Sequence, residues 1–150
     1  MPRVTRSRTL QAPVEEVWRL VSDPYSLPRW WPRTARVENV DRKEGGRRSQ
    51  WTKVLQTAEG RGVRADFRCL STAERERYVW EQELAGTPFE RHLSSSQIEI
   101  AMCGRGSETE VSISSMQSMK GMSRLGSPMM RRAQGAMLDA ALDGLEEALG

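Results

Sequence analysis

The feature of this sequence that most constrains its fold is a run of six strand-like segments joined by short connections. The connections contain glycine, proline and charged residues, as in KEGGRR, AEGRG and AGTP, and such compositions are typical of turns. Because parallel neighbours need crossovers of about a dozen residues or more, the short connections predict antiparallel pairing. We therefore expect a meander with strands at Thr34–Val40, Ser49–Thr57, Val63–Ser71, Arg77–Leu84, Phe89–Met102 and Glu108–Met116.

A further strand and two short helical pieces precede this meander. Residues Arg3–Gln11 alternate loosely and contain β-branched side chains, which favours a strand. Apolar residues then recur at helical spacing, at Val14, Val17, Trp18 and Val21. The Asp23-Pro24 pair should end this helix near Ser22, because the residue before proline disfavours the α region. The proline-rich stretch that follows leaves room for only one more helical fragment.

The chain closes with a long amphipathic segment, Pro128–Leu149, in which apolar residues recur at helical spacing. A helix of that length spans roughly 33 Å, enough to cross a whole sheet. No linker, repeat or low-complexity tract divides the 150 residues. The sequence therefore predicts a single α+β domain over residues 1–150, with a curved antiparallel sheet packed on a helix.

Composition narrows the classes of partner. The net charge of +3 comes from 23 basic residues interleaved with 20 acidic ones, which describes a mixed surface better than a nucleic-acid-binding stripe. No stretch approaches the ~20 apolar residues of a membrane span. The spacing of Cys69 and Cys103 supports neither a metal site nor a redox pair, and their expected state is that of buried free thiols. We expect a cytoplasmic protein without metal or cofactor, and a homodimer is compatible with this interpretation.

One stretch resembles a known family. In APVEEVWRLVSDPYSLPRWWPR, the residues Ala12, Pro13, Val17, Trp18, Val21 and Asp23, with the Trp31-Pro32 turn, match the opening of the START-related, Bet v 1-like (SRPBCC) superfamily. The stretch resembles in particular its bacterial members of polyketide cyclase/dehydrase type. This resemblance implies the helix-grip fold, in which seven antiparallel strands curl around a long C-terminal helix and enclose a cavity. It implies little about activity, because the family includes carriers, enzymes and proteins that act on other proteins.

Alternation along the strands predicts which side chains face that cavity. In VRADFRC, one face carries Val63, Ala65, Phe67 and Cys69, and the other face is charged. The same reasoning places Tyr78, Trp80 and Gln82 together, and groups His92, Ser94 and Ser96 with Ile98, Ile100 and Met102. Adjacent residues of an extended segment point opposite ways, so one of Trp30 and Trp31 should face the cavity and the other the outside or a partner.

These faces and the helix give a set of candidate ligand-binding residues. A methionine cluster at Met116, Met119, Met122, Met129 and Met130 lies where the last strand meets the long helix, at the family's cavity mouth. The predicted binding residues are Trp30, Phe67, Tyr78, Trp80, Gln82, His92, Ile98, Met130, Met137 and Ala141. A binding site for a hydrophobic small molecule has apolar walls with a few polar groups. A core without a cavity, whose polar residues are exposed to solvent at one end, would give the same sequence pattern.

Catalysis has no strong local signature. His92 is the single histidine, so it is the one side chain whose ordinary pKa lies near neutrality. An acid or base role for His92, helped by Tyr78 or Glu90, is one hypothesis, and a structural histidine is the other. Three functions follow in order of preference: a carrier of a hydrophobic or polyaromatic small molecule, a cyclase or dehydratase that uses pocket residues, and a module that binds another protein through an exposed Trp31.

Overall fold

The computed structural model describes residues 3–41, 49–56, 62–120 and 127–150. The described part of the chain contains seven strands: β1 (Arg3–Leu10), β2 (Thr34–Asp41), β3 (Gln50–Gln56), β4 (Gly62–Ala73), β5 (Arg77–Gln82), β6 (Leu93–Arg105) and β7 (Glu108–Met119). Its helices are α1 (Val14–Val21), α2 (Leu27–Trp30) and α3 (Ser127–Leu149), with 3₁₀ turns η1 (Pro24–Ser26) and η2 (Pro88–Arg91).

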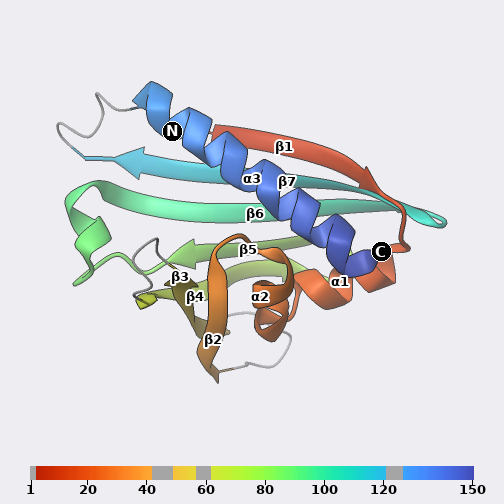
Figure 1. Cartoon of the computed structure of the whole chain (residues 1–150), viewed down its shortest axis with the longest axis horizontal. Helices are drawn as coiled ribbons and strands as arrows, with labels where there is room; N and C mark the ends of the chain where they lie inside the picture. Colours follow the sequence, from red (N-terminus) through yellow and green to blue (C-terminus); the bar gives the residue numbers. More distant parts are fainter. Residues whose placement is uncertain (1–2, 42–48, 57–61, 121–126) are drawn as a thin grey trace.

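The strands form one antiparallel sheet in the order β1-β7-β6-β5-β4-β3-β2. The six later strands pair with their neighbours in sequence, and β1 closes the other edge against β7. Figure 1 shows α3 lying across β1, β7 and β6, while β2 to β4 curve round beneath it. The predicted helix-grip fold, with its two short helical pieces between the first two strands, is confirmed.

The two short helices close one end of the curled sheet beside the C-terminal half of α3 (Figure 1). Helix α1 ends at Val21, and the Asp23 carboxylate then accepts a hydrogen bond from the Tyr25 backbone N–H at 3.0 Å. That bond caps the turn at Pro24, as expected where the chain cannot continue as a helix. The predicted helical face is buried at Val17 and Val21 and half-buried at Val14 and Trp18.

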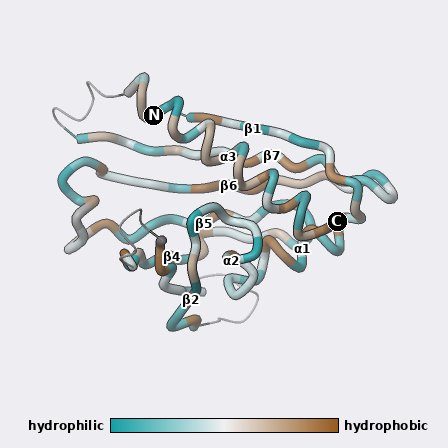
Figure 2. Tube along the Cα trace, viewed as in Figure 1, coloured by the Kyte–Doolittle hydropathy of each residue, from teal (hydrophilic) through white to brown (hydrophobic). Residues whose placement is uncertain are grey.

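Helix α3 has two halves with different surroundings. In the second half, Leu138, Ala141, Leu142 and Leu145 are buried in the core. Gly144 permits this close approach, since a Cβ at that position would lie 2.1 Å from the backbone oxygen of Trp30 in α2. In the first half, Ala133 and Ala136 are exposed, and Met129 is 80% exposed. Figure 2 shows hydrophilic segments, in teal, between the more apolar ones along α3, as expected of an amphipathic helix.

Arginines of β1 connect the first strand to the acidic residues of α3. Arg6 forms an ion pair with Asp139, and Arg8 contacts Asp143 and Glu146. These pairs are solvent-exposed, so each contributes little to stability. They explain why acidic residues are tolerated near the C-terminal end of α3, where the helix dipole alone disfavours them.

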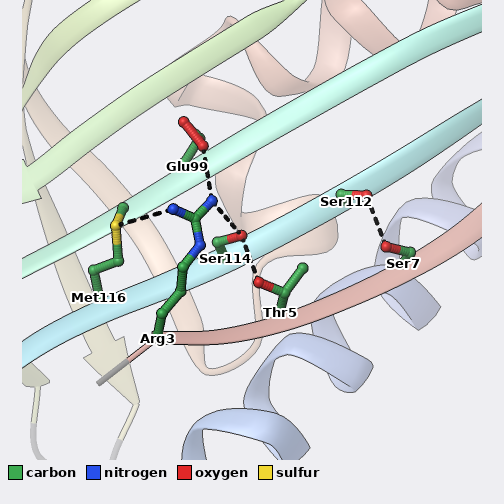
Figure 3. A network of polar contacts seen from close by, with 7 residues as sticks. All are labelled: Arg3, Thr5, Ser7, Glu99, Ser112, Ser114 and Met116. Atoms are coloured by element: carbon green, nitrogen blue, oxygen red, sulfur yellow. Dashed lines mark hydrogen bonds and ion pairs between the residues drawn. The ribbon is translucent and has the colours of Figure 1, made fainter. Parts of the chain in front are cut away.

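The outer face of β1, β6 and β7 is polar. Arg3 donates hydrogen bonds to Glu99 and Ser114, and the Ser7 and Ser112 hydroxyls share a hydrogen bond of 2.7 Å (Figure 3). The facing interior positions Thr109, Val111 and Ile113 are fully buried, as the alternation predicts. Among the described residues, no helix is long and apolar enough to cross a membrane.

Two local predictions are wrong. The strand expected from Phe89 begins at Leu93, because Pro88–Arg91 form a 3₁₀ turn, and a register shift follows between Leu93 and Ser95. That irregularity reverses the alternation, so Leu93 is buried and Ser94 exposed. The two thiols, both expected to be buried, also differ, since Cys69 is buried and Cys103 is exposed.

Candidate functional site

A cavity of about 800 Å³ lies between the concave face of the sheet and the first half of α3. It opens to solvent alongside the helix, where the exposed residues Ala133, Ala136 and Ala140 border it. Small side chains on this face of α3 keep the helix from filling the space above the sheet. The volume falls in the range of small-molecule sites in proteins, which is about 300–1,000 Å³.

The walls of the cavity are mainly aromatic and aliphatic. They include five of the residues predicted from strand and helix periodicity, namely Phe67, Trp80, Gln82, Ile98 and Met137. Further apolar lining comes from Val63, which alternation had placed on the cavity face, from Trp31, one of the two tryptophans considered for it, and from Leu55 and Phe89, which the prediction did not name. This composition favours ligands with a large apolar surface.

Polar groups occupy a few points of the lining. Gln82, Ser96, Gln117 and Gln134 each contribute to it. The Gln117 Nε2 donates to the Ser96 hydroxyl at 3.2 Å, while the buried Gln117 Oε1 accepts no hydrogen bond from the part of the chain that the structure describes. An unsatisfied buried acceptor is costly, so Gln117 Oε1 is suited to a ligand hydroxyl or N–H.

Lys53 is a cavity residue that sequence reasoning missed. Its side chain comes from β3, is only 4% exposed, and borders the cavity. The ammonium lies over the aromatic rings of Phe67 and Trp31, with Nζ to centroid distances of 4.4 and 5.1 Å. Burial lowers the pKa of the Lys53 ammonium to about 7. A lysine that changes charge near neutrality inside a cavity is able to bind an anion or to transfer a proton.

A signal for Lys53 was present in the sequence. Trp51, Lys53 and Leu55 alternate along one strand, and Trp51 and Leu55 are apolar. The register confirms this face, because Lys53 pairs with the buried Ala65 and Trp51 pairs with the buried Phe67. Sequence reasoning usually assigns a lysine to the solvent side of a strand, but the Lys53 side chain faces the cavity.

Both tryptophans of the Trp30-Trp31 pair are buried. Trp31 lines the cavity, whereas Trp30 lies outside it, in the core against α3 and the Trp80 ring. The two indoles meet edge to face with centroids 5.4 Å apart. The prediction that one of them points outward is wrong, because the chain at this point ends a helical turn instead of running extended, and Trp31 is 5% exposed.

The structure does not bring His92 and Tyr78 together. Tyr78 is buried and packs against Trp18, Trp51 and Trp80, outside the lining of the cavity. It pairs across the sheet with Ile100, and Leu93, next to His92, lies seven residues earlier in that strand, roughly 23 Å away. His92 is exposed and ends the 3₁₀ turn.

A second, more open cavity of about 500 Å³ adjoins the first, and Phe89 and Ala133 line both. His92, Met119, Met129 and Met130 border this second cavity. The predicted methionine cluster therefore lies partly at a cavity mouth, while Met122 lies outside the described residues. Of the remaining predicted binding residues, Ala141 is buried in the core and does not border either cavity.

Comparison with known proteins places this architecture in a family. The family described as polyketide cyclase / dehydrase and lipid transport matches residues 1–150. The chain belongs to this family. Among curated proteins, none matches the sequence. The START-like resemblance of the Trp-rich N-terminal stretch is thereby confirmed.

Solved structures share the fold of this cyclase and lipid-transport family member at low identity. A START superfamily protein from Mycobacterium smegmatis is 18% identical, with a TM-score of 0.80, and the match covers 98% of this chain and 96% of that one. A protein from Thermus thermophilus is 20% identical, with a TM-score of 0.76 and coverage of 99% and 97%.

A third structure is the di-domain ARO/CYC BexL from the BE-7585A biosynthetic pathway. It is 21% identical with a TM-score of 0.78, and the match covers 98% of this chain and 46% of that one. At these identities the likeness concerns the fold alone. Family and fold together support a ligand-binding domain of START or polyketide-cyclase type.

Proposed function

We propose that the protein binds a hydrophobic or polyaromatic small molecule, of lipid or polyketide type, in the 800 Å³ cavity between the sheet and α3. The observation that carries this proposal is the lining itself, in which aromatic and aliphatic walls surround a few polar groups. Family membership supports the same function. The predicted residues that we retain for it are Phe67, Trp80, Gln82, Ile98 and Met137.

Native mass spectrometry of protein purified from its own host tests this proposal, with organic extraction of any released compound. We expect a bound apolar compound at near 1:1 stoichiometry. The Ala136→Trp variant should lose it, because a large side chain at this lining position fills the cavity. The Glu147→Trp variant on the same helix should retain it, since Glu147 is exposed and does not border the cavity.

Two results together would contradict the carrier function. One is a clean apo mass for the wild-type protein. The other is unchanged tryptophan fluorescence during titration with a panel of hydrophobic compounds and aromatic acids, since Trp31 and Trp80 border the cavity and report on its contents. Their emission should be quenched by any polyaromatic occupant.

Lys53 favours a second candidate function, dehydration of a β-hydroxy ketone as in a cyclase or dehydratase. The neutral amine would take the proton from the carbon next to the carbonyl, and the ammonium so formed would return it to the β-hydroxyl as the C–O bond breaks, so that water leaves and a C=C bond forms. In this proposal Lys53 replaces the predicted pair His92 and Tyr78, of which neither borders the main cavity.

The test of this second function is the conversion of 4-hydroxy-4-phenyl-2-butanone to its conjugated ketone, followed by ultraviolet absorbance. We expect an acceleration of at least 100-fold that rises with pH through about 7, where Lys53 becomes neutral. Lys53→Met should abolish the acceleration, and Lys120→Met, at an exposed position, should preserve it. An equal rate in the Lys53→Met variant would exclude the role.

The location that we propose with these functions is the cytoplasm. Cys69 and Cys103 are both free, and free thiols are typical of a reducing compartment.

A further inference from the structure

The charged lining of the main cavity is entirely cationic. Among the described residues that border it, Lys53 and Arg33 carry charge, and no carboxylate does. Lys53 forms no ion pair with any described residue, and its neighbours at Nζ are two aromatic rings. A ligand that covers this ammonium must therefore supply the counter-charge, or leave a buried cation unpaired.

We propose that the ligand carries one acidic group, of which a carboxylate is the type, and that Lys53 holds this group inside the cavity with Arg33 at its entrance. This inference rests on the proposed carrier function and names the chemical class of its ligand. Arg33 is exposed and follows α2, and its left-handed φ of 58° is unusual for a residue with a side chain. It supplies a second positive charge at the rim.

The acidic residues nearest in sequence to the strand partners of Lys53 face the other side of the sheet. In β2 and β4, the direct partners of Lys53 are Val37 and Ala65, which are apolar. The flanking Glu38 pairs with Arg36 and Arg64, and the flanking Asp66 accepts a hydrogen bond from Thr52 at 2.6 Å. From α3 the lining groups are apolar or amide side chains. Arg33 is thus the other titratable side chain among the described residues that border the cavity.

The surroundings of Lys53 also define the body of the ligand. The Trp31 and Phe67 rings flank the ammonium and continue into the wall formed by Trp80 and Ile98. A flat apolar group joined to the acidic group would lie against these surfaces. The Gln117 Oε1 on β7, which accepts no hydrogen bond from a described residue, lines the same cavity and would receive a hydroxyl or N–H of the ligand away from β3.

A matched pair of fluorescent ligands tests the inference: 1-pyrenebutanoic acid and 1-pyrenebutanol, which share skeleton and size and differ in charge. Energy transfer from the cavity tryptophans to pyrene reports binding. At pH 6.5 the wild-type protein should bind the acid at least tenfold more tightly than the alcohol, because hydrogen bonds between charged groups are the strong ones. Lys53→Met should reduce affinity for the acid at least tenfold and change affinity for the alcohol less than twofold.

Lys120→Met is the matched control, because it removes the same charge from an exposed position. It should behave as wild type with both ligands. Retained binding of the alcohol by Lys53→Met shows that this variant is folded.

The pH dependence gives a second readout. The carboxylate stays ionised above pH 6, whereas Lys53 loses its charge as the pH rises through about 7. Above pH 7 the affinity for the acid should fall by up to tenfold per pH unit. The decrease should stop at the pKa of Lys53 in the complex, which the bound carboxylate raises above 7. Affinity for the alcohol should not fall in this way.

Two results would overturn the inference, and they are distinguishable. Equal binding of acid and alcohol, unchanged by Lys53→Met, would exclude the acidic ligand and leave the carrier function standing. Binding of neither compound, together with a clean apo mass from the host, would remove both the inference and the carrier function.

Discussion

Replacing Lys53 by methionine should raise the free energy of unfolding at pH 6 by on the order of 3 kcal/mol. The wild-type ammonium is buried without a carboxylate partner among the described residues, and its pKa is lowered to about 7 from its ordinary value of 10.5. Each pKa unit corresponds to about 1.36 kcal/mol, and the contacts with Trp31 and Phe67 offset about 1–2 kcal/mol of the burial penalty. Methionine has a similar length and no charge to desolvate.

The sign of the pH dependence follows from proton binding. Between about pH 7 and 10.5 the unfolded chain holds a proton on Lys53 that the folded protein has released, so the stability of the wild type rises with pH across this window. Below pH 7 the full penalty is present, and at pH 10 it should fall below about 1 kcal/mol. The advantage of Lys53→Met over the wild type should shrink accordingly.

Urea denaturation of three proteins at pH 6 and pH 10 measures this effect, with Lys120→Met as the third. The control should match the wild type within about 0.5 kcal/mol at both values, because Lys120 is exposed. A Lys53→Met variant without added stability at pH 6 would show that the ammonium is not desolvated. The buried Lys53 lowers the free energy of unfolding of the wild-type protein. Such a cost is expected where a residue is retained because it contributes to ligand binding.

The two glycines of α3 should respond to alanine in opposite directions. At Gly144, an added Cβ would lie 2.1 Å from the Trp30 oxygen and 2.8 Å from the Trp30 carbonyl carbon. These are backbone atoms, so α2 and α3 must separate, and we expect Gly144→Ala to destabilise the protein by on the order of 3 kcal/mol. That corresponds to a melting temperature about 6–12 °C lower.

At Gly135 the same substitution meets only a movable group. The nearest atom to an added Cβ is a guanidinium nitrogen of Arg6, whose exposed side chain is able to move into solvent. Alanine then gains helix propensity, and the ion pair with Asp139 contributes little, so Gly135→Ala should be neutral or stabilising by up to about 1 kcal/mol.

Thermal unfolding of both variants separates packing from propensity. Equal destabilisation by Gly144→Ala and Gly135→Ala would mean that the close contact between α2 and α3 at Gly144 does not contribute to stability. Gly144→Ala should also weaken ligand binding, because Trp31, which lines the cavity, directly follows Trp30.

The sequence was informative where periodicity and burial agree. Ala65 and Phe67 in β4, and Val111 and Ile113 in β7, are buried as their alternation predicts, because each strand is regular over these residues. The opening motif identified the superfamily, and short connections identified the meander.

The predictions failed where local geometry interrupts a period. The 3₁₀ turn at Pro88–Arg91 and the register shift after Leu93 displaced His92 and Ser94 from the expected face. Pro88, in the AGTP connection, marks the start of the turn but not its length, and a single sequence does not locate a register shift. Lys53 was missed for a different reason, since general preference assigns a charged side chain to solvent and only the cavity explains its burial.

The division of α3 into two halves separates the evolution of specificity from the maintenance of the fold. Leu138, Leu142 and Leu145 hold the second half in the core, while Ala133, Ala136 and Ala140 border the cavity without being buried in it. Exchange of these alanines for larger side chains changes the shape of the cavity and leaves the buried contacts of the helix intact. Substitutions at these positions on one face of α3 can therefore change the ligand without first requiring stabilising substitutions elsewhere in the chain.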